Sequence, residues 1–262
     1  MTEPEALRPR GSSRRVTAFG EIRDAVVGQG LRTLARTTPW VETELVGIAQ
    51  VVKPGDVCID VGAAAGFYTA ELARLVGADG LVYSLEPLRF AHATSSAALG
   101  LRSAQNVRRH AVALGTNVGE QVMSVPLRNG KPITGRSFVD AGADGLGSNA
   151  EFHEHIRVVV DTETFDGFCE RLNITRIDFV KIDVEGAELD VLVSGEKTIE
   201  RTRPAMMLEV EDRHMERFGR TADDIVAWFA ARDYRMSVWS ADSWRPVDKV
   251  TETFRNYLFQ PR

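Results

Sequence analysis

Two segments of this sequence each have the pattern of a short buried strand that ends at an acidic residue and then turns at a glycine. The first spans residues 57–66 and reads VCIDVGAAAG, and the second spans residues 179–188 and reads FVKIDVEGAE. Apolar runs of this length before a glycine and a helical pattern predict parallel strands of an α/β sheet. Ligands of open α/β sheets bind beyond the carboxyl ends of the strands. We therefore expect Asp60 and Asp183 at one ligand-binding edge.

Strand-like and helix-like segments alternate through most of the chain after residue 56. We predict strands over residues 57–61, 81–85, 107–112, 121–125, 156–160, 177–182, 205–210, 235–238 and 254–259. Helices are predicted over residues 68–76, 90–99, 165–172, 187–193 and 222–231. This alternation indicates βαβ units and a mostly parallel sheet with helices on both faces. The last two strands have no helix between them, which predicts an antiparallel edge.

The chain of 262 residues has the length of one α/β domain with a small extension. We expect the polar residues 1–15 to form a disordered tail and residues 16–50 to form an N-terminal helical extension. The α/β domain then covers residues 51–262. Within it, the glycine-punctuated residues 128–155 lack periodicity, and long loops of this kind are usually functional or disordered. We expect them to form a lid on the substrate side of the site.

Composition disfavours several classes of protein. The net charge of -5 argues against nucleic acid as a partner, because nucleic-acid-binding proteins usually present a basic face. No apolar run approaches about 18 residues, so we expect no membrane span, and the first residues lack the apolar core of a secretory signal. Cys58 and Cys169 lie in apolar stretches and are predicted to be reduced core residues, which fits a cytoplasmic protein. The sequence gives no indication of the oligomeric state.

The loop after the first strand has the pattern of a site for a nucleotide with little phosphate. Gly62 and Gly66 bracket three alanines, and such small residues let the backbone approach a ligand closely. The glycine spacing is neither the dinucleotide fingerprint nor a Walker loop, which disfavours a phosphate-rich ligand. Acidic residues at the same edge favour a cationic nucleotide, of which S-adenosylmethionine is the commonest.

The order of the strands places further residues in this cofactor site. Glu86 ends the second strand about 20 residues after Gly66, which is the offset of the acid that binds a ribose diol, and Pro87 then stops the strand. We place Asp60 at the methionine end, where an ammonium and a sulfonium need negative charge, and Ala113 at the adenine ring. The predicted cofactor-binding residues are Asp60, Gly62, Ala63, Gly66, Glu86, Pro87, Ala113 and Asp183.

These motifs resemble those of the FkbM-type methyltransferases over roughly residues 50–260. The resemblance lies in PGDV at 54–57, DVGA at 60–63, GFYT at 66–69, LEP at 85–87, TFD at 164–166, NYLF at 256–259 and, most specifically, KIDVEGAE at 181–188. It implies a class I S-adenosylmethionine-dependent methyltransferase fold with a seven-stranded, Rossmann-like sheet. It also implies O-methylation of a hydroxyl group on a sugar or a polyketide-type metabolite. The family usually has asparagine where this chain has Ala64, which implies one hydrogen bond fewer to the cofactor.

Methyl transfer to an alcohol needs a base that accepts the hydroxyl proton. Asp183, at the end of the predicted central strand, is suited to act as that base or to orient the acceptor. Lys181 shares its strand face, with a structural ion pair as the alternative role. Glu185 and Glu188 are expected either at the site or as acids that favour a helix start. The further candidates at and after the next strand are Glu209, Glu211, Asp212 and His214, of which Glu209 and His214 are the predicted catalytic residues.

A metal role stays open at this point. Asp183, Glu209 and His214 would together offer ligands to a hard cation such as Mg²⁺, for which oxygen ligands would have to dominate. His153 and His155 flank the glycine-rich segment and suit either a lid or a metal.

The leading hypothesis is therefore an O-methyltransferase that acts on a small hydroxyl-bearing acceptor. A NAD(P)-dependent oxidoreductase on a similar sheet is one alternative, and the missing G-x-G-x-x-G pattern disfavours it. A non-catalytic protein that binds S-adenosylmethionine is another, and the acids at Asp60, Glu86 and Asp183 disfavour that. A nucleic-acid methyltransferase is disfavoured by the acidic balance of the chain.

Overall fold

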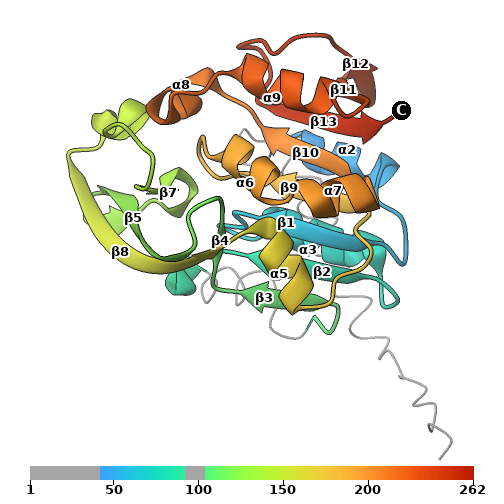
Figure 1. Cartoon of the computed structure of the whole chain (residues 1–262), viewed down its shortest axis with the longest axis horizontal. Helices are drawn as coiled ribbons and strands as arrows, with labels where there is room; N and C mark the ends of the chain where they lie inside the picture. Colours follow the sequence, from blue (N-terminus) through green and yellow to red (C-terminus); the bar gives the residue numbers. More distant parts are fainter. Residues whose placement is uncertain (1–41, 92–103) are drawn as a thin grey trace, which may run out of the picture.

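The computed structural model describes residues 42–91 and 104–262, which form two sheets with helices around the larger one (Figure 1). The predicted tail at 1–15, most of the extension at 16–50 and most of the helix at 90–99 lie outside the described residues. No helix in the described part of the chain is long and apolar enough to cross a membrane.

The larger sheet has eight strands in the order β12-β11-β13-β10-β9-β1-β2-β3. They are β1 Val57–Val61, β2 Leu81–Leu85, β3 Val107–His110, β9 Phe179–Ile182, β10 Ala205–Glu209, β11 Tyr234–Ser240, β12 Ser243–Pro246 and β13 Asn256–Pro261. The strands from β10 to β3 pair in parallel, whereas β11, β12 and β13 pair antiparallel. The predicted α/β class with an antiparallel edge is confirmed. The predicted count of seven strands was wrong, because the larger sheet has eight strands.

The unpredicted strand, β12, belongs to a tight hairpin. Ala241 and Asp242 connect β11 to β12 with φ values of 50° and 58°, and Ser240 pairs with Ser243 across the turn. Two central residues with positive φ are the mark of a type I′ turn, whose twist matches that of the strands it joins. Asparagine-glycine is the usual signal for this turn and alanine-aspartate is not, so the sequence pattern did not reveal the hairpin.

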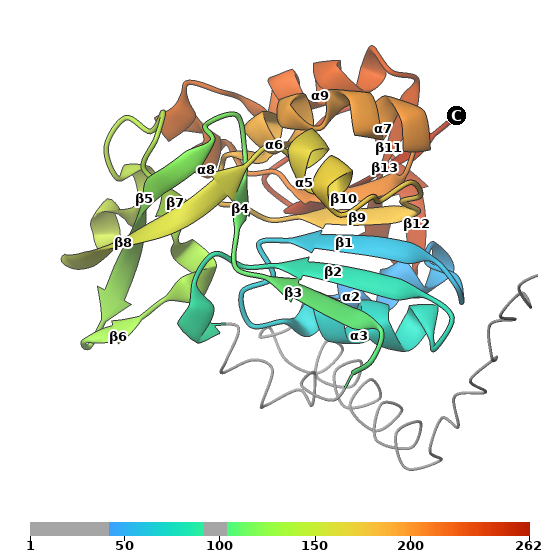
Figure 2. The same ribbon diagram turned by 60° about the horizontal axis from the view of Figure 1, so that its bottom comes forward.

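Helices cover both faces of the larger sheet, as predicted (Figure 2). One face carries α2 Glu44–Gly47, η1 Ile48–Gln50 and α3 Phe67–Val76, and the other carries α5 Phe165–Arg171, α6 Glu188–Ser194, α7 Glu196–Thr202 and α9 Ala222–Ala230. A separate apolar cluster fills each face: Leu45 and Leu72 belong to the first, Phe168 and Ile199 to the second. Both cysteines are buried and unpaired, as expected, and burial raises the pKa of each thiol.

The second sheet is built on one long antiparallel pair of strands, β5 and β8. Its strands are β4 Ala113–Leu114, β5 Gly119–Arg128, β6 Lys131–Pro132, β7 Phe138–Val139 and β8 Glu154–Glu163, and β5 pairs with β8 along most of its length. The strands predicted at 121–125 and 156–160 are present, but they belong to this sheet and not to the larger one. Val159 is 63% exposed, which fits an antiparallel sheet with one solvated face and not a strand buried between helices.

The turn after β1 lies against the turn after β9 through a close backbone approach. Gly62 has a φ of 80°, and a Cβ built on it would lie 1.8 Å from the carbonyl oxygen of Asp183. A side chain here would strain a left-handed backbone and also push the two turns apart. This contact holds the loop at residues 62–66 beside Asp183, which defines the ligand-binding edge.

Replacing Gly62 with alanine should destabilise the fold by more than backbone strain alone. A left-handed conformation costs an L-residue about 1–2 kcal/mol. We expect Gly62→Ala to lose about 3–4 kcal/mol, because the overlap with Asp183 must also be relieved. Gly55→Ala is the matched control, since Gly55 has a φ of 84° and no atom within 4 Å of its built Cβ. Urea unfolding measures both variants, and equal losses would contradict a structural role for the contact.

Candidate functional site

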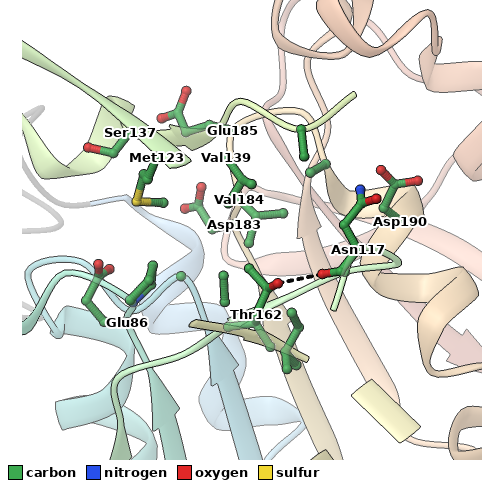
Figure 3. Close-up of a pocket in the computed structure, with 18 of the residues that line it drawn as sticks. Glu86, Asn117, Met123, Ser137, Val139, Thr162, Asp183, Val184, Glu185 and Asp190 are labelled. Atoms are coloured by element: carbon green, nitrogen blue, oxygen red, sulfur yellow. Dashed lines mark hydrogen bonds between the residues drawn. The ribbon is translucent and has the colours of Figure 1, made fainter. Parts of the chain in front are cut away.

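Two cavities lie at the carboxyl ends of β1, β2 and β9, and Gly62, Ala64 and Asp183 belong to the walls of both. The first has about 890 Å³ of empty space and lies between the larger sheet and the second sheet (Figure 3). The other has about 580 Å³ and lies beside the loop at residues 62–66. The shared wall therefore indicates one site with two parts.

Glu86 follows β2 directly and lines the first cavity. Pro87 and Ala113 line the same cavity. The backbone N–H of Ala64 donates to Oε2 of Glu86 at 2.9 Å, and that of Leu88 donates to Oε1 at 2.9 Å. Burial raises the pKa of Glu86 to about 7, although the two N–H donors oppose the shift. A carboxylate oxygen accepts more than one hydrogen bond, so Glu86 keeps acceptor capacity for a ligand.

The second sheet and its connection supply the other wall of the first cavity. Met123 of β5 and Thr162 of β8 line it, together with Thr134, Gly135, Ser137, Val139 and Ala141 from the segment at residues 128–155. The segment predicted to be a lid therefore borders the cavity; its function as a lid stays a prediction. Among the described residues that line this cavity, none is a lysine or an arginine.

Asp60 is buried in the wall of the second cavity, with Gly62, Ala63 and Gly66 beside it. The Thr69 hydroxyl donates to Oδ2 of Asp60 at 2.5 Å. Burial raises the pKa of Asp60 to about 6, against the opposing effects of Thr69 and the nearby Lys181 charge. Every predicted cofactor-binding residue thus lines one or both of the two cavities.

The ammonium of Lys181 is buried among carboxylates. Its Nζ lies 3.3 Å from Oδ2 of Asp183 and 5.1 Å from the centre of the Tyr68 ring. Burial lowers the pKa of Lys181, but the negative charges of Asp183, Glu42, Glu209 and Asp60 outweigh it, so the pKa is raised above its usual value. Lys181 therefore forms the predicted ion pair and also lines the second cavity.

Three carboxylates meet beside this ammonium. Among the described residues, Glu42, Asp183 and Glu209 bring one oxygen each within 4.8 Å of the others. Burial raises the pKa of Glu209 well above its usual value, and Asp183 and Glu185 add to the shift. The metal-ligand set considered from the sequence, Asp183 with Glu209 and His214, is not brought together, since Glu42 is the third member of the cluster and His214 contacts Glu185 instead.

His214 lies behind the wall of the first cavity and lines neither cavity. Its ring is buried, and Nδ1 contacts Oε2 of Glu185, which does line the first cavity. As a general base, His214 would have to act through Glu185 in this structure. Glu188 accepts the N–H groups of Val184 and Gly186 at 3.1 Å each, so it fixes the turn after β9.

His153 and His155 line neither cavity. His153 is exposed, and Nδ1 of His155 lies 3.2 Å from the hydroxyl oxygen of Ser124. The roles in a lid or a metal site considered for these two histidines gain no geometric support.

Sequence reasoning missed two residues of the second cavity. Glu42 lies just before α2, where only the apolar residues follow a pattern, and it accepts the Tyr68 hydroxyl at 2.6 Å. Tyr68 lies in the GFYT motif, which points to the loop but not to the charged neighbours of its ring. The motif was therefore a usable signal for Tyr68, whereas Glu42 had none.

Comparison with known proteins identifies the family of this chain. The model of the methyltransferase FkbM domain matches residues 60–236. No curated protein matches the sequence. A methyltransferase FkbM from Methylobacillus flagellatus KT is 17% identical with a TM-score of 0.48, and the match covers 92% of this chain but only 60% of that one. An O-methyltransferase from Bacillus cereus in complex with SAH is 11% identical with a TM-score of 0.47, and the match covers 92% of this chain and 91% of that one.

Replacing Lys181 with methionine keeps most of the side-chain volume but removes the charge. Without the ammonium, the pKa values of Asp60 and Glu209 rise further, so the folded protein binds more protons than the unfolded chain near neutral pH. We expect a loss of about 3–5 kcal/mol at pH 8, as for a broken buried ion pair. The loss should be smaller at pH 5, where these groups are already protonated in the folded state.

Urea unfolding at the two pH values measures this difference. Lys197→Met is the control, because Lys197 is exposed on α7. A loss of equal size at both pH values would mean that Lys181 acts through packing and not through its charge.

Proposed function

The chain belongs to the FkbM methyltransferase family, and we propose that it transfers a methyl group from S-adenosylmethionine to a hydroxyl group of a sugar or polyketide-type acceptor. The observation that carries this proposal is the wall that the two cavities share. Asp183 lies in that wall, between Glu86 on one side and Asp60 with Lys181 on the other. A nucleoside joined to a charged amino acid fits across such a wall, and an acceptor then approaches Asp183 through the rest of the first cavity.

The residues present fit this cofactor. The buried carboxylate of Glu86 is suited to accept the two hydroxyls of a ribose, and Ala113 and Leu114 offer apolar surface to an adenine ring. In the second cavity, Asp60 and Glu42 supply negative charge for an ammonium group. The small residues of the loop leave room for close approach of the ligand.

The proposed mechanism needs one base at the shared wall. S-adenosylmethionine, when bound, would supply a methyl carbon to which an alcohol oxygen bonds in line as the C–S bond breaks and S-adenosylhomocysteine leaves. The side chain of Asp183 is 30% exposed, and Lys181 contacts its Oδ2, which leaves Oδ1 for the acceptor. Asp183 accepts the hydroxyl proton as the new C–O bond forms.

We propose that Lys181, and not Mg²⁺, supplies the positive charge beside Asp183. Its ammonium already lies at ion-pair distance from Asp183 and within the field of Glu42 and Glu209. A divalent cation bound by the same three carboxylates would have to overcome repulsion from this buried charge.

The lining of the first cavity favours a neutral acceptor. Thr134, Ser137 and Thr162 offer hydroxyl groups, whereas Met123 and Phe218 offer apolar surface. This mixture suits a sugar ring or a polyketide hydroxyl. Phosphorylated acceptors and nucleic acids usually need cationic side chains, which the described lining residues do not provide.

Calorimetry tests the cofactor class. We expect S-adenosylmethionine and S-adenosylhomocysteine to bind and NADPH not to bind, and the reverse result would overturn the proposal. Transfer of a radiolabelled methyl group to a panel of sugars and polyketide alcohols then tests the activity. Binding without transfer to any acceptor would instead favour a non-catalytic protein.

Glu86→Gln should weaken binding of S-adenosylhomocysteine by about 1.5–3 kcal/mol, the range for a hydrogen bond to a charged group. The wild-type affinity should also fall as the pH is lowered through about 7, because protonation of Glu86 removes acceptor capacity for the ribose. The variant should lose this step and keep any dependence near pH 6 that arises from Asp60. Calorimetric titrations between pH 5.5 and 8.5 measure both effects, and an unchanged affinity in the variant would refute the ribose assignment.

Asp183→Asn should lower the turnover number by about 10²–10⁴, the usual contribution of a general base. Affinity for S-adenosylhomocysteine should change little, because the amide has the shape of the carboxylate. Single-turnover methyl transfer and calorimetry on the same preparation separate the two quantities. If affinity and turnover fall by the same factor, Asp183 belongs to the cofactor site and not to the chemistry.

A further inference from the structure

Arg136 connects the wall of the first cavity to the turn that carries Asp183. It lies between the lining residues Gly135 and Ser137, but its own side chain does not line the cavity. Its Nε lies 3.6 Å from Oε2 of Glu185, and its Nη1 lies 3.3 Å from Oε1 of Glu151. The backbone of the wall and the turn after β9 are therefore linked through one guanidinium.

Glu185 is the partner of Arg136 on the larger sheet, and its backbone is strained. It has a φ of 57°, although it is not a glycine, and its side chain is 6% exposed. Its carboxylate contacts both Arg136 and His214, which favour its ionised form, but burial and the nearby charge of Asp183 outweigh them and raise the pKa of Glu185. Strained residues of this kind persist where surrounding contacts fix them, and they cluster at functional sites.

The chain around His214 packs against the turn after β9. A Cβ built on Gly186 would lie 2.2 Å from the carbonyl oxygen of His214, so the two turns are packed directly on each other. Arg217 is buried, and its Nε donates to that same carbonyl at 3.1 Å. Its Nη2 donates to the hydroxyl of Ser148 at 3.3 Å, which is a second tie to the connection between β5 and β8.

The contacts of the segment itself are also polar and enclosed. Asn149 is completely buried, its Nδ2 donates to the carbonyl of Arg136 at 2.7 Å, and its Oδ1 accepts from Nε of Arg136 at 3.2 Å. Figure 3 shows Ser137 and Glu185 at the same end of the cavity, with Asp183 next to them. A change in the Arg136–Glu185 contact would therefore alter the distance between the wall and Asp183.

We propose that Arg136, Glu185 and His214 form a clasp that positions the wall at residues 134–141 against the Asp183 turn and so controls acceptor binding. Arg136 and His214 are positioning residues, since neither lines a cavity, whereas Glu185 also lines the first cavity. The part that concerns the acceptor rests on the proposed function, whereas the clasp itself does not. Misplacement of a bound acceptor by a small distance slows transfer strongly, because the reacting atoms must be aligned.

Hydrogen exchange on the full chain tests the clasp without any acceptor. Arg136→Ala and Glu185→Gln should each speed exchange at residues 134–151 by roughly tenfold or more, the scale expected when one partner of an enclosed charge pair is removed. Arg136→Lys should recover part of the protection. Arg128→Ala is the matched control, because Arg128 lies 5.4 Å from the same Phe152 ring that Arg136 faces at 5.5 Å. Unchanged exchange in both clasp variants would overturn the proposal.

Binding and kinetics then test the assignment to the acceptor. The Arg136 variants should bind S-adenosylhomocysteine like the wild type and show a raised KM for the acceptor, with a smaller change in kcat. Lost affinity for S-adenosylhomocysteine in these variants would assign the network to the cofactor site and refute the proposal. Failure of the wild type to bind S-adenosylhomocysteine would refute the proposed function instead, and the exchange data would still decide whether the clasp exists.

Discussion

The buried ammonium of Lys181 is the interaction on which the ligand-binding edge depends. Parallel strands deliver their carboxyl ends to one edge of a sheet, and here β1, β9 and β10 each end near an acid. Lys181 pairs in register with Asp60 on one side and with Met207 on the other, so its charge lies in the middle of that edge. Isolated carboxylates are costly to bury, and a central cation offsets much of that cost.

The second sheet turns this open edge into an enclosed site. An α/β sheet alone would leave the ends of β1, β2 and β9 facing solvent, because its helices cover the two faces and not the edge. The paired strands β5 and β8 lie beside that edge and line the first cavity, and so do residues of the segment at 128–155. The insertion therefore contributes shape and hydroxyl groups to the first cavity, while the charged groups come mainly from the larger sheet.

That the predicted cofactor-binding residues line the two cavities could be foreseen because their signals are local. An apolar strand followed by an acid and a glycine locates Asp60, Glu86 or Asp183 without knowledge of any distant residue. The surroundings of His214 were not predictable in this way. It lies against Glu185 and Gly186, which belong to a different turn. Likewise, alternating patterns located β5 and β8 but could not show that they pair with each other in a separate sheet.

The surplus of negative charge at this edge also bears on the direction of the proposed reaction. Glu42, Asp60, Asp183 and Glu209 face a single buried ammonium, and burial raises the pKa of Asp60 to about 6 although Thr69 and Lys181 oppose the shift. A sulfonium placed there adds the missing positive charge and favours the ionised carboxylates, whereas a thioether does not. Transfer of the methyl group removes that positive charge while protonation of Asp183 removes one negative charge, so the net charge of the edge stays the same during the step. The same electrostatics therefore favour binding of the methyl donor and weaken the hold on its product.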